Sequence, residues 1–289
     1  MLNIKHILFP IDFSERCSGA AAFVESIARR YSASITLLSV AQPFFYAAMG
    51  DPGGEATIVN TEDLLRGLKA RLDKSLTKNF AGLRVDRVTD LGDPAQVIAD
   101  FAHTQGVDLI MMPTHGYGPF RSLLLGSVAA KVLHDAKCPV WTAAHAAKPP
   151  DSGHVDCRNI LCAVDGGPES VSLMRWASEF SADAGATLRL VHVVAGMEGA
   201  LSRQLDREFE EDMRTQAQRT IDGLRESAGV KAPLSVVTGG VSDCVRDEAS
   251  LHDAALVVIG RGSLQETFGR LRTHAYGIIR QSPCPVLSV

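Results

Sequence analysis

The sequence predicts two tandem α/β domains, each built on a doubly wound parallel sheet, and three observations lead to this fold class. An apolar strand ending in aspartate occurs at residues 7–12 and again at 160–165, 153 positions later (160 − 7). A Cys-Pro-Val sequence closes each half, at 138–140 and at 284–286. Between these markers apolar strands alternate with helical patterns, which implies parallel pairing through right-handed crossovers. A repeat this long indicates duplicated domains rather than a solenoid.

In the first half, local patterns place each element. Strands are expected near 5–11, 35–40, 84–89, 108–112 and 139–142, and helices near 14–31, 61–80, from 94 onward and 126–136. Ser14 is expected to cap the first helix. Leucines at helical spacing from Leu64 to Leu76 predict the second. Pro94, preceded by Asp93, fits the first turn of the third. The strands are short and apolar, as expected when helices cover both sheet faces.

The second half repeats this order. Strands are expected near 159–164, 186–194, 233–238, 255–259 and 285–289, and helices near 168–184, 200–228, 241–253 and 273–282. A turn-rich stretch at 146–153, with two consecutive prolines, separates the halves. The expected domains are therefore 1–146 and 155–289.

Composition narrows the classes of function. Hydrophobic residues make up 46% of the chain and charged residues 21%, as in ordinary globular proteins. Residues 1–147 are charge-neutral and the remainder carries the net charge of −4, so neither half is a basic platform for nucleic acid. No apolar run is long enough to span a membrane. The amino-terminal residues enter a strand without a signal-peptide pattern, so the cytoplasm is the expected location. The cysteines and histidines show no metal-ligand spacing.

The loop after the fourth strand, residues 113–127, is the first candidate site. Gly126 and Ser127 would open the following helix, and free N–H groups at a helix N-terminus attract phosphate. The alternative is that this glycine and serine merely cap a helix.

Asp12, at the end of the first strand, is the second candidate. Its carboxylate could accept hydrogen bonds from a base or a ribose. Alternatively, Asp12 or Ser14 caps the first helix, with Glu15 completing a capping box from Asp12. Val40, at the end of the second strand, would flank the same crevice, because ligands of such sheets lie beyond the carboxyl ends of strands where the strand order reverses.

Catalysis has weaker support in the sequence. His115 lies in the candidate loop, but no carboxylate is close in sequence, so donation to a phosphate oxygen is favoured over acid–base work, and a histidine without a role stays open. Walker loops, dinucleotide fingerprints and nucleophile motifs are absent from the sequence.

These residues together resemble the universal stress protein family, once in each half. The resemblance rests on Asp12, on Gly92-Asp93-Pro94, on the apolar fourth strand, on the loop ending at 124–127 and on the Cys-Pro-Val closure. It implies a five-stranded parallel sheet of order 3-2-1-4-5 in each domain, as in adenine nucleotide alpha hydrolase-like folds.

One branch of that family binds ATP through a motif of glycine, two residues, glycine, nine residues, and then Gly-Ser or Gly-Thr. This chain matches it from Gly116 through Gly126 and Ser127, but Pro113 replaces the first glycine and has no N–H to offer. By resemblance, Asp12 and Val40 would contact adenine and ribose. The nucleotide-binding residues that the resemblance implies are Pro10, Asp12, Val40, Met112, His115, Gly116, Gly126, Ser127 and Val128.

The second half departs further from the motif. Counting back from the Cys-Pro-Val closure, Gly126 aligns with Arg272 and Ser127 with Thr273. Arginine would block close backbone approach, although it could pair with phosphate. A degenerate second site is therefore expected, in a domain that acts as a tethered partner.

The resemblance implies a regulatory protein of the stress response that binds ATP or AMP, with Mg²⁺ able to accompany the phosphates. It also implies an intramolecular pseudo-dimer through strands near 140 and 286, and a homodimer remains open. The alternatives are an interaction module that binds no nucleotide, or a slow ATPase in which Arg121 is the nearby cation.

Overall fold

The protein is described from a computed structural model. It describes residues 2–42, 60–114, 125–143, 157–195, 203–261 and 270–289, without the side chains of 203–208 and 270–273. The chain divides into two compact units, one containing Asn3–Ala143 and the other containing residues 157–289. Each unit is described by itself.

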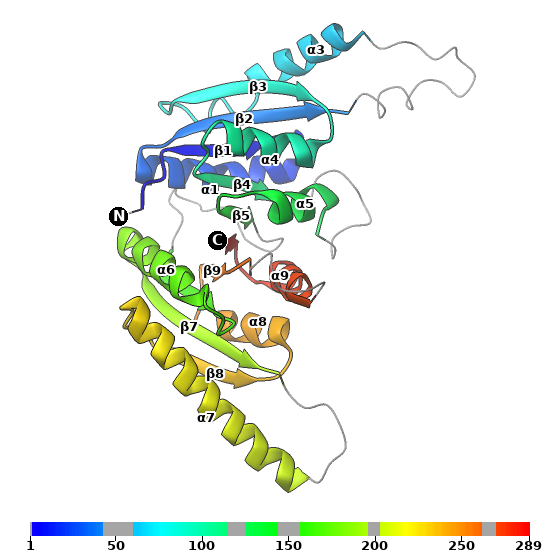
Figure 1. Cartoon of the computed structure of the whole chain (residues 1–289). Coiled ribbons are helices and arrows are strands. Elements are labelled where there is room, and N and C mark those ends of the chain that lie inside the picture. Colours follow the sequence, from blue (N-terminus) through cyan, green and yellow to red (C-terminus); the bar gives the residue numbers. More distant parts are fainter. Residues whose placement is uncertain (1, 43–59, 115–124, 144–156, 196–202, 262–269) are drawn as a thin grey trace, which may run out of the picture. The chain divides into compact units, whose positions relative to one another are not determined.

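The first unit contains a parallel five-stranded sheet (Figure 1). Its strands are β1 (His6–Pro10), β2 (Ser34–Ala41), β3 (Val85–Leu91), β4 (Leu109–Pro113) and β5 (Val140–Ala143). They follow the order β3-β2-β1-β4-β5, which confirms the expected 3-2-1-4-5 topology. The order reverses at β1, which has β2 on one side and β4 on the other.

Helices cover this sheet on both faces, and their caps follow from local sequence. They are α1 (Glu15–Tyr31), α3 (Thr61–Lys74), α4 (Pro94–Thr104) and α5 (Ser127–Asp135). Ser14 caps α1, as predicted, by accepting the N–H of Cys17 at 3.3 Å. Asp93 caps α4 by accepting the N–H of Gln96 at 2.9 Å, and Pro94 begins this helix, as predicted.

Helix α3 is shorter than the expected 61–80. It ends at Lys74 because Ser75 is extended and Leu76 has a φ of 55°, so the leucine periodicity continues past the point where the backbone leaves the helix. The predicted end of this helix was wrong.

The second unit repeats the topology. Its strands are β6 (Asn159–Ala163), β7 (Thr187–Val194), β8 (Leu234–Thr238), β9 (Leu256–Ile259) and β10 (Val286–Ser288), in the order β10-β9-β6-β7-β8. Its helices are α6 (Ser170–Ala184), α7 (Arg203–Ala228), α8 (Val241–Leu251) and α9 (Arg270–Gln281). All its strand pairs are parallel. β6 therefore takes the place of β1, β7 that of β2, and β9 that of β4.

The cores lie on both faces of the sheets. Ile7, Leu8 and Phe9 follow one another along β1, point alternately to opposite faces, and are all fully buried. The ring of Phe9 meets that of Phe80 edge-on, with centroids 6.3 Å apart. Burial of consecutive residues is typical of a parallel sheet covered by helices on both sides.

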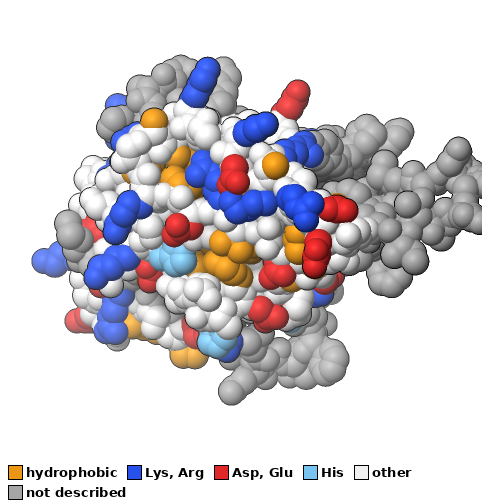
Figure 2. All heavy atoms as spheres, turned by 90° about the horizontal axis from the view of Figure 1, so that it is seen from above, with side chains coloured by type: hydrophobic (Ala, Val, Ile, Leu, Met, Phe, Trp, Pro, Cys, Tyr) orange, Lys and Arg blue, Asp and Glu red, His pale blue; other side chains and the backbone are white. Residues whose placement is uncertain are grey.

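The described surface is mixed in charge. Figure 2 shows one face, on which Lys and Arg side chains lie interspersed with Asp and Glu. On α3, Arg66 pairs with Asp63 at 2.8 Å and Lys69 pairs with Asp73. Within the described residues, the structure contains no helix that is both long enough and apolar enough to cross a membrane.

Candidate functional site

The candidate site of the first unit lies at the carboxyl ends of β1, β2 and β4. Pro10 ends β1, Val40 lies near the end of β2, and Met112 and Pro113 end β4. Because these strands are neighbours and parallel, their ends meet at the point where the strand order reverses, which is where α/β sheets bind ligands. His115 and Gly116 lie outside the described residues.

Asp12 holds the turn between β1 and α1 together. Its Oδ1 accepts the N–H of Ser14 at 2.9 Å and the thiol of Cys17 at 2.8 Å. Ser14, and not Asp12, is the N-cap, so Cys17 takes the place that Glu15 would fill in a capping box. The predicted box from Asp12 is therefore wrong. Both described bonds use Oδ1, and among the described residues Oδ2 has no partner.

The thiol beside Asp12 is a poor nucleophile. Burial, followed by the negative charge of Asp12, raises the pKa of Cys17 to about 12. A neutral thiol can donate to the carboxylate, whereas a thiolate would repel it. Cys17 therefore acts as a hydrogen-bond donor that orients the carboxylate.

The end of β2 is tied to the end of β1 by a side chain. The hydroxyl of Ser39 donates to the carbonyl oxygen of Ile11 at 3.0 Å, and the N–H of Ile11 donates to the carbonyl oxygen of Leu38 at 2.8 Å. These bonds fix Val40, which is half-buried, beside the Asp12 turn.

The N-terminus of α5 is open to a ligand at two amides. Gly126 is the N-cap and makes no side-chain cap bond, and the first turn carries no acidic residue. Among the described residues, the N–H groups of Ser127 and Val128 have no partner, and Ser127 is exposed. The amide of Gly126 was expected to be available too, but it donates to the carbonyl oxygen of Thr114 at 2.9 Å, which closes the base of the loop.

One cation lies further along α5. The ammonium group of Lys131 lies 3.2 Å from Oδ1 of Asp93 on the exposed surface. The pKa of Asp93 is held below its usual value, mainly by the hydrogen bond from the N–H of Gln96 and next by Lys131. This pair spans α4 and α5 near the same sheet edge.

The second unit builds the same turn from different residues. Strand register shows the equivalence: Pro10 pairs with Leu38 and Ala163 pairs with Val191, so both positions differ by 153. Asp165 Oδ1 accepts the N–H of Gly167 at 2.9 Å and the hydroxyl of Ser170 at 2.8 Å. The two bonds of Asp12 are therefore reproduced, with a serine in place of the cysteine.

The tie between the strand ends is also reproduced. His192, the equivalent of Ser39, bonds the carbonyl oxygen of Val164 through Nδ1 at 2.8 Å. A carbonyl oxygen only accepts hydrogen bonds, so Nδ1 carries the proton. Sequence reasoning did not single out His192, although its spacing of 153 from Ser39 (192 − 39) was available as a signal.

The loops after β4 and β9 differ between the units. Leu8 pairs with Ile110 and Leu161 with Val257, so this part of the repeat is offset by 147 (257 − 110) and Gly260 takes the place of Pro113. The first glycine of the family motif thus has a counterpart in the second unit. The side chains of Arg272 and Thr273 lie outside the described residues. The prediction that Arg272 blocks close approach of a ligand to the backbone there is therefore not described either.

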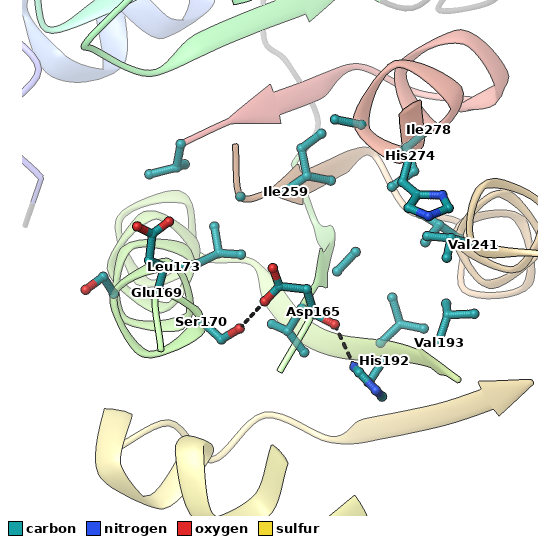
Figure 3. A pocket seen from close by; sticks show the side chains of 18 of the residues that line it. Asp165, Glu169, Ser170, Leu173, His192, Val193, Val241, Ile259, His274 and Ile278 are labelled. Atoms are coloured by element: carbon teal, nitrogen blue, oxygen red, sulfur yellow. Dashed lines mark hydrogen bonds between the residues drawn. The ribbon is translucent and has the colours of Figure 1, made fainter. Parts of the chain in front are cut away.

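A cavity of about 520 Å³ lies at this position in the second unit. It is lined by the ends of β6, β7 and β9 and by α6, α8 and α9 (Figure 3). Its volume falls within the range of roughly 300–1,000 Å³ typical of small-molecule sites. Sequence reasoning did not predict this cavity, because its walls come from elements far apart in the chain.

Metal chemistry has no structural anchor in the described part of the chain. There, no three His, Cys, Asp or Glu side chains gather closely enough to hold an ion. Magnesium brought by a nucleotide would have to be held largely by phosphates and water.

Comparison with known proteins gives a consistent result. A universal stress protein of Methanocaldococcus jannaschii is 28% identical over 149 residues, which is 47% of this chain and 92% of the relative. A universal stress protein of Archaeoglobus fulgidus, solved as a crystal structure, covers 99% of this chain and 96% of its own at 20% identity and a TM-score of 0.67. A universal stress protein crystallised in complex with cAMP covers 49% of this chain and 97% of its own at 18% identity, with a TM-score of 0.39.

The second of these likenesses shows the fold of the whole chain. The family itself is shown by the sequence match, which occurs twice, over residues 3–143 and 157–289. The chain belongs to the universal stress protein family.

Proposed function

We propose that this chain is a regulatory protein of the stress response that binds an adenine nucleotide in its first domain. The observation that carries the proposal is the arrangement at the end of β4. The open N–H groups of Ser127 and Val128 belong to the same sheet edge as the carboxylate of Asp12, which is held by Ser14 and Cys17. Free N–H groups that bind an anion and a carboxylate that accepts hydrogen bonds lie at one edge. They suit a ligand with phosphates at one end and a base or ribose at the other.

The roles follow from the chemistry of each group. Asp12 Oδ2 would accept a donor from the base or the ribose, and Val40 would pack against the same part of the ligand. Ser127 and Val128 would bind phosphate through their amides, and the Ser127 hydroxyl would add a donor. Pro10 and Met112 would shape the floor between them. By the family resemblance, His115 would line the path of the ribose and phosphates, and the amide of Gly116 would be available to the ligand.

ATP or AMP is the proposed ligand, and Mg²⁺ would accompany the phosphates without a carboxylate cage of its own. The domains are proposed as 1–146 and 155–289, joined as a pseudo-dimer through the strands near 140 and 286. The cytoplasm is the proposed location. For the second domain we propose a phosphate site degraded by Arg272.

The experiment compares two arginine substitutions. Gly126→Arg copies Arg272 into the first domain, where its side chain would cover the start of α5. Gly67→Arg adds the same charge at an exposed glycine of α3 that has open space around it. Calorimetric titration with ATP should show binding by the parent and by Gly67→Arg, and at least tenfold weaker binding by Gly126→Arg. Equal binding by all three would contradict the site.

An interaction module that binds no nucleotide is the second candidate. It is favoured by Pro113, which ends β4 without an N–H group where the family motif has glycine. Denaturing the purified chain and identifying any released nucleotide distinguishes the two. No released nucleotide, together with no heat on titration with ATP or AMP, would favour the interaction module.

A further inference from the structure

The cavity of the second unit differs in chemistry from the phosphate-binding edge of the first. Its floor is apolar: Val164, Leu173, Val245, Ile259 and Ile278 line it and are each at most 6% exposed. These side chains come from β9, from the residue that follows β6 and from three helices, so the apolar volume is built into the fold. Such a floor stabilises a ligand with a compact apolar body.

The charged groups at the cavity are acidic. Asp165 and Glu169 line it, whereas no Lys or Arg does so among the described residues. In Figure 3 the carboxylate of Asp165 lies toward the middle of the cavity, and the ring of His192 points away from it. Oδ1 of Asp165 is already used by Gly167 and Ser170, so a new donor would bind at Oδ2.

Two of the helices at this cavity, α6 and α8, carry an acidic residue at their N-termini. Glu169 occupies the N-cap position of α6, and Asp243 lies in the first turn of α8. Negative side chains at these positions offset the positive end of the helix dipole. The first turn of α9, like that of α5, has no acidic residue. A polyphosphate therefore gains less at the ends of α6 and α8, and a cation gains more there.

We propose that the cavity at the carboxyl ends of β6, β7 and β9 binds a small amphipathic amine, with its apolar body on the valine, leucine and isoleucine floor and its ammonium group on Asp165. This goes beyond the nucleotide site proposed for the first domain, and it does not depend on that site. The tethered second domain is then a second ligand-binding domain, which binds an amine rather than a nucleotide.

The test uses three probes that share one apolar body and differ in charge. They are 4-phenylbutylamine, 4-phenylbutanol and 4-phenylbutanoate, titrated into the full chain by calorimetry and followed by ligand-observed NMR. The amine should bind about tenfold more tightly than the alcohol, since a hydrogen bond to a charged group is stronger than a neutral one. The carboxylate should bind most weakly. Equal affinity for the amine and the carboxylate, or a preference for the carboxylate, would overturn the proposal.

Two matched substitutions locate the binding. Asp165→Asn keeps the shape and the oxygen that accepts from Gly167 and Ser170, and should weaken the amine about tenfold while leaving the alcohol unchanged. Asp12→Asn, at the equivalent position of the first unit, should leave the amine unchanged. If Asp165→Asn binds the amine as the parent does, the assignment of the ammonium group fails.

A further pair separates this proposal from the nucleotide site. Ala275→Phe, on the α9 wall of the cavity, should abolish binding of the amine and the alcohol while circular dichroism and thermal unfolding show a folded chain. Gly126→Arg should leave amine affinity unchanged whether or not it removes ATP binding. If ATP competes with the amine, and Arg272→Gly changes the strength of that competition, the second unit contains a nucleotide site and the proposal is overturned.

Discussion

The two units build one turn from the same hydrogen bonds and from different side chains. Asp12 and Asp165 each accept a backbone N–H at 2.9 Å and a side-chain donor at 2.8 Å. The donor is a thiol in one unit and a hydroxyl in the other. The geometry of the turn is thus the same although the side-chain donor differs. The aspartate therefore serves first to stabilise the turn and only secondarily to bind a ligand.

A second pair shows the same principle at the end of the neighbouring strand. Ser39 and His192 both bond the carbonyl oxygen that follows the first strand of their unit, at 3.0 Å and 2.8 Å. A serine satisfies this acceptor with little volume, whereas a histidine adds a ring beside Gly166. The difference teaches that the scaffold fixes the acceptor, and the side chain that meets it is free to reshape the surroundings.

The largest expected effect comes from breaking a backbone feature that both units share. Gly92 and Gly239 have φ values of 144° and 149°, and their N–H groups bond equivalent strand carbonyls at 3.0 Å. A Cβ would lie 2.9 Å from Cys244 Sγ at Gly239 and 3.1 Å from Val97 Cγ2 at Gly92. Gly239→Ala should cost about 3 kcal/mol and Gly92→Ala about 2 kcal/mol, from backbone strain and crowding.

Urea unfolding gives these free energies, and hydrogen exchange in β3 and β8 assigns each loss to one unit. Gly223→Ala is the matched control, because this glycine lies in α7, is exposed and has open space around it. It should stabilise the chain by about 0.5–1 kcal/mol. A larger loss for Gly92→Ala than for Gly239→Ala would contradict the role given to Cys244.

The next effect depends on pH and separates the thiol from the hydroxyl. The pKa of Cys17 is about 12 in the folded chain, raised from 9.0 by burial and by Asp12. Above pH 9 the unfolded chain loses this proton and the folded chain keeps it, so the free energy of unfolding falls as pH rises between 9 and 12. At pH 10 the loss is about 1.4 kcal/mol. Ser170 does not titrate in this range.

Cys17→Ser turns the first turn into the second and should flatten this dependence. Urea unfolding at pH 8 and pH 10 measures the free energy of unfolding of each protein. The value for the parent minus the value for the variant should be about 1.4 kcal/mol lower at pH 10 than at pH 8. Cys162, whose pKa burial also raises to about 12, stays in both proteins and cancels. Parallel pH profiles would show that the Cys17 thiol does not contribute.

Local signals allowed much of the fold to be predicted from the sequence. Ser14 caps α1 and Pro94 begins α4, as expected, because the start of a helix depends on a few neighbouring residues. The alternation of strands and helices, with the family resemblance, led to the sheet order. The end of α3 was missed because Leu76 has helical periodicity but sits at a φ of 55°.

The site was less predictable, for physical reasons. The rule that ligands bind beyond the carboxyl ends of strands directed attention to Asp12, Val40 and Gly126. The structure brings those strand ends together. Yet the bond from Gly126 to Thr114 crosses the loop and has no sequence signature. The cavity of the second unit depends on the floor that Val164, β9 and three helices form together, and a pairwise comparison of the repeats does not reveal a volume.

The smallest effect concerns the residue after each aspartate, which is Phe13 in one unit and Gly166 in the other. Both have positive φ, 64° and 83°. Gly166→Ala should cost about 1 kcal/mol from backbone strain, because its Cβ would make ordinary contacts of 3.4 and 3.6 Å. Phe13 bears that strain but gains a cation–π contact, with Arg71 Cζ 4.0 Å from the ring centroid.

Phe13→Gly should therefore change stability by less than about 1 kcal/mol, since relief of strain offsets loss of the contact. A double-mutant cycle with Arg71→Ala separates the two contributions. If the cation–π contact is what retains Phe13, the coupling should be about 0.5 kcal/mol and Phe13→Gly should become stabilising in the Arg71→Ala background. Zero coupling would mean that the strain at Phe13 is offset by its packing against other neighbours, and the two turns would then differ in their cores rather than at their surfaces.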